Sequence, residues 1–320
     1  MPKKDKEKKV AIIILGMNNK SLVKNCLESL KKYTTNKNYK TIFSDNGSTD
    51  GTIEMIKKDF KWVDLIENGK NLGFNGANNI GVKYAIEKYN SDYFFLLNND
   101  TIILHKNWLE NLVEVGEKIP SSGVVGCRLI YPDGSLQHYA IEEKIYDFAQ
   151  GEKKYLIEDE KKKENKIQKV KHMIGAAFLI KRKLIDKIGL FDPLFFPIYG
   201  EEIDYCERAR KNGYKIIYTP KTTIIHLRGQ TTNPKKIIDH WGISKKNSII
   251  LELMNYSFIE IIYWQFVHFG AVFLSKEFGK IKFRKEFLKR FYVLIKAYSK
   301  AFKHLPEIIH KRKNRDEKIW

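Results

Sequence analysis

The stretch that decides the fold, Tyr93-Phe94-Phe95-Leu96-Leu97-Asn98-Asn99-Asp100, joins five apolar residues to a polar triplet. The apolar run is typical of a strand that is buried on both faces of a sheet. In open α/β sheets, ligands bind beyond the carboxyl ends of the strands. The triplet is therefore either a polar turn that caps the strand or a ligand site, since one carboxylate plus a diphosphate can hold Mg²⁺ or Mn²⁺.

Strands and helices alternate on the N-terminal side of this stretch. Residues 10–15 form a short β-branched run, and a helix with apolar residues at helical spacing follows it. We expect further strands at 41–44 and 63–66, with helices at 52–59 and 76–89. The alternation predicts an open α/β sheet with right-handed crossovers.

The C-terminal side is less regular. The segment of about residues 137–171 is highly charged, and we interpret it as an insertion or lid. Strand and helix patterns resume at about residue 173, with strand-like segments near 215–218 and 222–225, and helices rich in aromatics and lysine begin at about residue 233. The predicted organisation is a basic N-terminal tail (1–9), an α/β domain (10–232) and a C-terminal helical region (233–320).

Composition limits the classes of protein that fit. The 58 Lys+Arg residues outnumber the 38 Asp+Glu residues and give a net charge of +20, which favours an anionic partner such as nucleic acid, acidic phospholipid or a phosphorylated substrate. The three cysteines lack any C-x-x-C spacing, which argues against a disulfide framework or a zinc site and fits a reducing compartment. No signal-peptide pattern and no uncharged apolar run of spanning length occurs, so we expect a cytoplasmic protein.

Two glycine- and amide-rich loops follow other predicted strands. Asp45 opens the first loop, where it could accept hydrogen bonds from a base or ribose, or simply form an Asx-type turn. The second loop, at 71–79, leads into a helix whose N-terminal N–H groups suit a diphosphate. Neither loop has the spacing of a P-loop or of a G-x-G-x-x-G fingerprint, so nucleotide hydrolases and dinucleotide oxidoreductases lose support.

Acidic residues and a histidine complete the candidates. Glu201, Glu202 and Asp204 lie in the first turn of a predicted helix, where acids stabilise the helix by about 0.3–1 kcal/mol each. One of them could instead be a general base, and the residues alone leave both interpretations open. His226 and Arg228 follow a strand-like segment and could meet a phosphate or metal, although a lone histidine is more often structural.

In their order along the chain, these segments resemble the family 2 glycosyltransferases of GT-A fold, particularly the rhamnosyltransferase-like branch of cell-surface polysaccharide synthesis. The similarity covers about residues 10–230. The segments that carry it are SDNGSTDGT at 44–52, NLGFNGANN at 71–79, LLNNDT at 96–101, GAAFLI at 175–180 with Phe191-Asp192, EEIDYCER at 201–208, and His226.

The resemblance implies a Rossmann-like open mixed sheet flanked by helices, and an inverting, metal-dependent transfer that uses Mg²⁺ or Mn²⁺. Asp100 and His226 would bind the metal, and Glu202 would be the base, with Asp204 and Glu201 as alternatives. The donor, dTDP-rhamnose or a UDP-sugar, would pass its sugar to a saccharide or lipid-linked acceptor. The predicted donor-binding residues are Asn18, Asp45, Gly47, Asn71, Gly73, Asn75, Asn78, Asn98, Asn99 and Arg228.

This sequence departs from the family pattern at two points. The D-x-D metal motif appears as Asn98-x-Asp100, so metal affinity without the nucleotide is expected to be modest. The E-D pair appears as Glu201-Glu202, which places the expected base on a side chain that is one methylene longer.

The C-terminal region lies outside the resemblance. Residues 249–274 are apolar and aromatic, and residues 276–303 interleave lysine and arginine with aromatics. This pattern suits a peripheral helix on an anionic cytoplasmic leaflet, and it equally suits a helical hairpin packed on the catalytic domain or in a homodimer interface.

Two rival functions stand beside the enzyme. One is a non-catalytic relative that only binds a nucleotide-sugar. The other is a nucleic-acid-binding protein, which the basic composition favours but no reading motif supports. We therefore expect no nucleic-acid partner.

Overall fold

The structure is a computed structural model that describes residues 8–35, 37–137, 165–227, 237–277, 280–283, 285–314 and 318–320. Most of the predicted insertion (138–164), most of the N-terminal tail and Arg228 lie outside the described residues. The strands of the main sheet are β1 (Val10–Gly16), β2 (Tyr39–Asp45), β3 (Val63–Glu67), β4 (Tyr93–Asn98), β5 (Thr101–Ile103), β6 (Ser122–Ile130), β7 (Gln168–Val170), β8 (Ala177–Lys181) and β9 (Lys215–His226).

The strand order is β3-β2-β1-β4-β8-β6-β9-β5, with β7 paired to β9. The decisive stretch forms β4, a central strand that pairs in parallel with β1 and antiparallel with β8. Its apolar run is buried throughout, because strands on both sides and helices on both faces cover it. The sheet is therefore mixed, as the GT-A resemblance implies.

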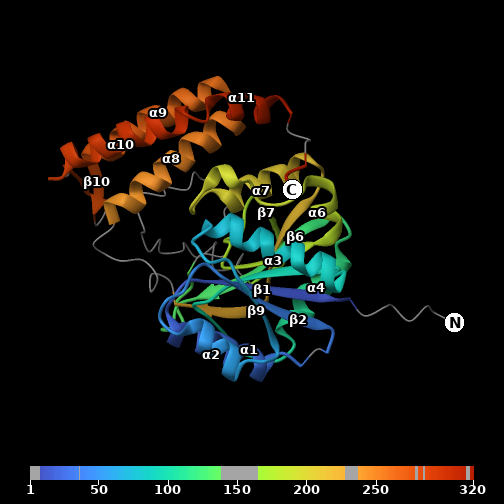
Figure 1. The fold of residues 1–320 in the computed structure, drawn as a ribbon. Coiled ribbons are helices and arrows are strands. Elements are labelled where there is room, and N and C mark those ends of the chain that lie inside the picture. Colours follow the sequence, from blue (N-terminus) through green and yellow to red (C-terminus); the bar gives the residue numbers. More distant parts are fainter. Residues whose placement is uncertain are drawn as a thin grey trace.

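In the described part of the α/β domain, six helices cover the two faces of the sheet (Figure 1). They are α1 (Lys20–Tyr33), α2 (Thr52–Asp59), α3 (Gly73–Tyr89), α4 (Trp108–Lys118), α6 (Arg182–Ile188) and α7 (Glu201–Lys211). Successive side chains of a strand point to opposite faces. Ile12 and Ile14 accordingly join the core that holds α1, α2 and α4, whereas Ala11 and Ile13 join the core that holds α3, α6 and α7.

The strand β9 corrects one expectation. The sequence suggests two separate strands near 215–218 and 222–225, with Pro220 between them. The structure has one continuous strand, and its pairing with β6 shifts register between Thr219 and Thr223. Proline cannot donate to a ladder, and a register shift is where a sheet tolerates it.

The C-terminal region is helical, with α8 (Ile237–Asn255), α9 (Phe258–Phe273), α10 (Phe287–Phe302) and α11 (Leu305–Lys313), and a hairpin of β10 (Leu274–Glu277) and β11 (Lys280–Phe283). In Figure 1, α8 is the long helix nearest the α/β domain, and α9 and α10 lie on its outer side. Ile249 and Ile250 of α8 share a core with Ile203 of α7 and Phe195 of the 3₁₀ turn η1 (Pro193–Phe195). The helical region is thus packed on the α/β domain. None of the described helices is long and apolar enough to cross a bilayer.

A buried ion pair also joins the two regions. Lys311 of α11 lies 2.7 Å from the Asp192 Oδ1 atom, and the Asp192 side chain is completely buried. Burial opposes the charge on Lys311, but the carboxylates of Asp192 and Glu307 outweigh it and raise the lysine pKa. Lys311 therefore compensates a carboxylate that would otherwise be buried without a cation.

We expect Lys311→Met to lower the free energy of unfolding by about 1–3 kcal/mol, the cost of leaving a buried polar group unpaired. Lys313→Met removes the same charge from an exposed position of the same helix, and its effect should stay within about 0.5 kcal/mol. Denaturant unfolding of both variants provides the measurement. Equal stability of the two would contradict the structural role of the ion pair.

Candidate active site

Asp45, at the end of β2, folds its own loop. Its Oδ2 atom accepts hydrogen bonds from the backbone N–H groups of Gly47 (2.9 Å) and Ser48 (2.8 Å), and the Ser48 hydroxyl donates to Oδ1. Gly47 adopts φ 86°, and a Cβ there would lie 3.2 Å from the Lys70 Cα. The Asx-type turn is therefore present, and contacts of Asp45 and Gly47 with a donor stay a prediction.

Asn46 connects this loop to the next one. Its Nδ2 atom donates to the carbonyl oxygen of Gly73 at 3.1 Å and lies 3.4 Å from the Asn71 Oδ1 atom. Asn68 donates to the Ser44 hydroxyl and to the Asn46 side chain. Two loops that are separate in sequence thus form one amide-linked unit, in which the predicted residues Asn71 and Gly73 take part.

The amides of α3 are directed into the protein. Asn75 donates to the Asp192 carbonyl at 2.6 Å, and Asn78 donates to the Phe74 carbonyl one turn earlier. The Asn79 Nδ2 atom donates to the Phe191 carbonyl at 2.8 Å, and the Asn79 Oδ1 atom accepts from the Phe191 N–H at 3.1 Å. Asn75 and Asn79 therefore hold α3 against the segment before α7, whereas the bond of Asn78 lies within α3. A direct contact of Asn75 or Asn78 with a donor stays a prediction.

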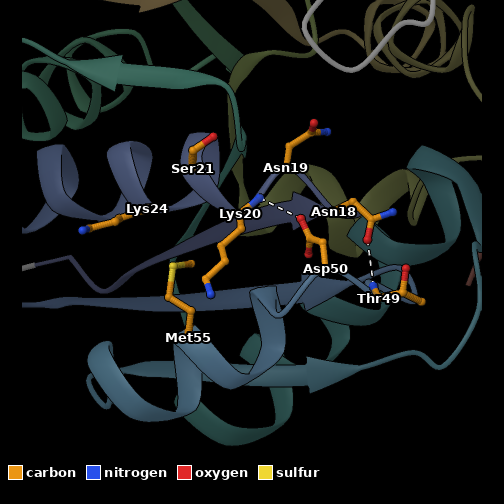
Figure 2. Close-up of a pocket in the computed structure, with 8 residues that line it drawn as sticks. All are labelled: Asn18, Asn19, Lys20, Ser21, Lys24, Thr49, Asp50 and Met55. Carbon is orange, nitrogen blue, oxygen red and sulfur yellow. Dashed lines mark hydrogen bonds between the residues drawn. The ribbon is translucent and has the colours of Figure 1, made fainter.

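Asn18 lies beside a pocket between the first turn of α1 and the loop after β2 (Figure 2). Its Oδ1 atom accepts from the Thr49 backbone N–H at 2.7 Å, and its own N–H donates to the Ser48 hydroxyl. The Lys20 N–H donates to the Asp50 carboxylate at 2.9 Å. Asn18 thus ties the end of β1 to the loop that Asp45 shapes.

The predicted metal ligands Asp100 and His226 lie together. The antiparallel pairing of β5 with β9 sets Thr101 opposite His226. It brings the His226 Nε2 atom to 3.3 Å from the Asp100 Oδ1 atom, with both side chains largely buried. Asn98 is the third member of the group, with its Nδ2 atom 3.5 Å from His226 Nε2. Asn99 is buried beside them.

Gln137 fixes the orientation of the His226 ring. Its Nε2 atom donates to the His226 carbonyl at 2.5 Å, which turns its Oε1 atom toward His226 Nδ1 at 2.9 Å. A carbonyl oxygen can only accept, so Nδ1 carries a proton, and in the neutral ring the lone pair of Nε2 is then on the side of Asp100. A partner on the second ring nitrogen is what usually orients a ligating histidine.

The donor set fits a divalent cation. A carboxylate oxygen and an imidazole lone pair face each other at 3.3 Å, and two neighbouring ligands of an octahedral metal at 2.0–2.1 Å lie about 2.9 Å apart. A small rotation of either side chain would achieve that spacing. Within the described ranges, no group of three or more His, Cys, Asp and Glu side chains could hold a metal ion. A cation held by this pair would need further oxygen ligands, and water and a bound diphosphate supply oxygens of the kind that Mg²⁺ prefers.

The acidic side chains at the start of α7 differ sharply from one another. Asp204 is completely buried and bonds to Arg208, whose guanidinium also donates to the carbonyls of Ile188 and Leu190. This ion pair gives Asp204 a structural contact and weakens its candidacy as a base.

Glu201 and Glu202 carry the perturbed carboxyl groups. Burial, and then the charge of Glu202, raise the pKa of Glu201 well above its ordinary value. Burial raises the pKa of Glu202 to about 7, although part of the residue is still exposed to solvent. A carboxylate with a pKa near neutrality suits a general base, so the electrostatics favour Glu202.

The segment before α7 is held from two sides. Asn247 of α8 donates to the carbonyls of Phe195, Ile198 and Tyr199 at 2.7–2.9 Å. On the other side, the Phe74 N–H donates to the Pro197 carbonyl at 2.8 Å. The C-terminal region and the second loop thus both position the start of the helix that carries Glu202.

Sequence reasoning missed Gln137 and Asn247. Gln137 stands at the edge of a charged segment, and its contact with His226 spans 89 residues of sequence. Asn247 stands in a polar stretch of its helix, between Lys246 and Ser248, so no local pattern of the sequence marks it.

Comparison with known proteins places these features in context. The model of the family described as Glycosyl transferase family 2 matches residues 11–189. The rhamnosyltransferase WbbL of Escherichia coli (strain K12) is 28% identical over 226 residues, which are 68% of this chain and 83% of that protein. The N-acetylglucosaminyl-diphospho-decaprenol L-rhamnosyltransferase of Mycobacterium tuberculosis (strain ATCC 25618 / H37Rv) is 24% identical over 214 residues, 60% of this chain and 67% of that protein.

Two further curated relatives are much longer, and the matched parts are only 26% and 18% of their lengths. Among solved structures, the mannosyltransferase PcManGT from Pyrobaculum calidifontis, in complex with GDP-Man and Mn²⁺, aligns with a TM-score of 0.57 and 13% identity. The alignment covers 94% of this chain and 76% of that one. This likeness confirms the predicted GT-A fold.

Loss of Gln137 should change the tautomer of His226. In the wild type, we expect ¹⁵N NMR of labelled histidines to show His226 protonated at Nδ1 at a pH where the ring is neutral. Gln137→Leu removes the acceptor at Nδ1, so the Nε2–H tautomer, which can donate to Asp100, should become the main form.

His172, whose Nε2 atom lies 2.8 Å from Glu207, serves as the internal control and should keep its signals. An unchanged His226 tautomer in Gln137→Leu would contradict the role of this glutamine.

Proposed function

The chain belongs to family 2 of the glycosyl transferases, and we propose that it moves a sugar from a nucleoside-diphosphate donor to an acceptor hydroxyl with inversion at the anomeric carbon. The observation that carries the proposal is the Asp100–His226 pair, 3.3 Å apart at the end of β4, with the second ring nitrogen held by Gln137.

Asp100 and His226 are proposed to hold Mg²⁺ or Mn²⁺ against the donor diphosphate. A divalent cation, when bound, offsets the negative charge that develops on a leaving nucleoside diphosphate. The Mn²⁺ and GDP-mannose in the mannosyltransferase structure support this assignment, because that protein shares the fold. Asn98 is next to the pair and is proposed to contact the ribose side of the donor.

Glu202 is proposed to be the general base. The acceptor oxygen attacks the anomeric carbon, the bond from that carbon to the diphosphate oxygen breaks, and Glu202 takes the proton of the acceptor hydroxyl. Its raised pKa of about 7 supports the role, since an ordinary exposed glutamate would be a much weaker base. Asp204 is engaged by Arg208, and Glu201 is more deeply buried.

The donor is proposed to be dTDP-rhamnose or a UDP-sugar, and the acceptor a saccharide or lipid-linked saccharide of cell-surface polysaccharide synthesis. Two relatives named as rhamnosyltransferases support the donor class. The name of one of them specifies an acceptor on a decaprenyl diphosphate, which supports a lipid-linked acceptor. A thermal-shift screen of dTDP-, UDP- and GDP-sugars with Mn²⁺, followed by a transfer assay with the stabilising donor, tests both. Donor binding without any transfer or hydrolysis would instead identify a non-catalytic relative.

Glu202→Gln should keep donor binding and reduce kcat by about 10²–10⁴-fold, the usual contribution of a general base. In the wild type, kcat/KM should be level above pH about 7 and fall about tenfold per pH unit below it, because protonation of Glu202 removes the base. Transfer rates measured across pH, with donor affinity from the thermal-shift assay, check both expectations.

The same variant separates catalysis from stability. The folded-state pKa of Glu202 lies above its ordinary value, so its stabilising contribution is complete at low pH and is lost as pH rises through about 7. Glutamine does not ionise. Glu202→Gln should therefore be at least as stable as the wild type at about pH 8, and a full transfer rate in this folded variant would exclude Glu202 as the base.

Asp100→Asn should weaken Mn²⁺ binding in the presence of UDP by at least about tenfold, because a neutral amide replaces the charged ligand of the pair. Asp186→Asn is the matched control, since it removes the same charge from an exposed position on α6. Titration of Mn²⁺ followed by electron paramagnetic resonance measures both. Equal affinities would remove Asp100 from the metal site.

A further inference from the structure

The helices α9 and α10 expose a broad apolar surface. On α9, the side chains of Phe258, Ile259 and Phe266 are 75–80% exposed. On α10, Leu288 and Tyr292 are 70% and 66% exposed. The remaining exposed apolar members of the surface are Ile262, Tyr263, Phe269, Phe291, Ile295 and Phe302. So many neighbouring apolar side chains mark an interaction site rather than an ordinary surface.

A buried polar network fixes the direction in which α9 presents this surface. His268 lies on the opposite face of α9, with its Nε2 atom 2.8 Å from Glu252 and its Nδ1 atom 3.1 Å from Lys245, both of α8. Gln265 also donates to Glu252 and accepts from the Tyr298 hydroxyl of α10. The inner faces of α9 and α10 therefore pack against the rest of the protein, and the exposed apolar faces point away from it.

The lysines of α10 form a border to this surface. At 100° per residue, Leu288, Phe291, Tyr292, Ile295 and Phe302 share one side of the helix. Lys289, Lys296, Lys300 and Lys303 follow in the adjoining sector, and the buried residues Leu294, Ala297 and Ala301 occupy a third. An exposed apolar sector with lysines along its edge and aromatic side chains within it is the pattern of a helix lying in a membrane interface.

Charge decides between a bilayer and a second copy of the chain. Residues 285–314 contain nine lysines and arginines and only two glutamates, and the whole chain carries +20. Face-to-face pairing of two copies would bring two lysine borders together with too few acids to neutralise them, since Glu260 of α9 and Glu286 are the exposed carboxylates at the ends of these helices. An anionic lipid surface complements both the apolar sector and the lysines.

We propose that the surface formed by α9 and α10, which we call the docking face, lies on an anionic lipid bilayer with its aromatic and aliphatic side chains in the interface and its lysines among the headgroups. The proposal rests on the proposed function in one respect, since a lipid-linked acceptor would be met at such a surface. Figure 1 shows the docking helices on the outer side of α8, away from the main sheet. The docking helices α9 and α10 lie on the bilayer and are not long and apolar enough to cross it.

Flotation of the full chain with vesicles tests the docking face. The wild type should float with phosphatidylcholine vesicles that contain phosphatidylglycerol, and should remain in the bottom fraction with phosphatidylcholine alone. Ile259→Ser combined with Phe266→Ser should lower the partition coefficient at least about tenfold without a change of charge. Both positions are so exposed that the melting temperature should not fall.

Matched variants distinguish binding through the docking face from attraction by the overall positive charge of the chain. Lys289→Gln with Lys296→Gln should weaken flotation, whereas Lys31→Gln with Lys32→Gln, which removes the same charge from exposed positions of α1, should not. Leu104→Ser removes an exposed apolar side chain from another part of the surface and should float like the wild type.

Several results would overturn the proposal. Undiminished flotation of the Ile259→Ser/Phe266→Ser variant would do so, and so would equal loss from both lysine pairs. Light scattering that shows a wild-type dimer dissolved by this variant, with no flotation of either protein, would identify the face as a contact between copies.

An assay of sugar transfer to a water-soluble acceptor tests the proposed function independently of membrane binding. The docking variants should retain that transfer and the thermal shift with the donor. A wild type that floats but transfers no sugar would refute the proposed function and leave the docking face standing.

Discussion

The pairing of β5 with β9 is the contact on which the candidate site depends. β5 has only three residues, yet its ladder sets Thr101 opposite His226 and so brings Asp100 to the imidazole. A slip of one residue would turn His226 to the other face of the sheet, because side chains alternate along a strand. The backbone also joins at this point, since the Leu227 N–H donates to the Asp100 carbonyl at 2.9 Å. The position of the pair is therefore set by sheet register, and Gln137 adds the orientation of the ring.

Opposing electrostatic effects distinguish the acidic residues of α7. The helix N-terminus stabilises a carboxylate by about 0.3–1 kcal/mol, which is less than one pKa unit at about 1.36 kcal/mol per unit. Burial is the stronger effect at Glu202, whose pKa rises to about 7. Asp204, two residues later, lies next to the Arg208 guanidinium and is engaged by it at 2.8 Å. If these acids served only to stabilise the N-terminus of the helix, their surroundings would not need to differ so much within one turn.

The sequence alone predicts the alternating strands and helices near β4, because each of those elements has its own local pattern of apolar residues. It also marks Asp100, His226 and the acids at 201–204 as candidates, and the resemblance to a family then assigns each a role. It could not show that Asn75 and Asn79 hold α3 to the segment before α7, since their contacts join residues more than 110 positions apart. Nor could it separate Glu202 from Asp204, because the difference comes from burial and from the Arg208 ion pair.

The C-terminal region is part of the support of the site as well as the carrier of the docking face. Asn247 of α8 holds the backbone of Phe195, Ile198 and Tyr199 directly before α7, and Lys311 of α11 neutralises Asp192 just upstream. The same α8 anchors α9 through Glu252 and His268. The helix α8 therefore contacts both the docking face and the start of α7, the helix that carries the proposed base. If α9 and α10 lie on a bilayer, these contacts also determine the orientation in which Glu202 faces an acceptor that extends from the lipid.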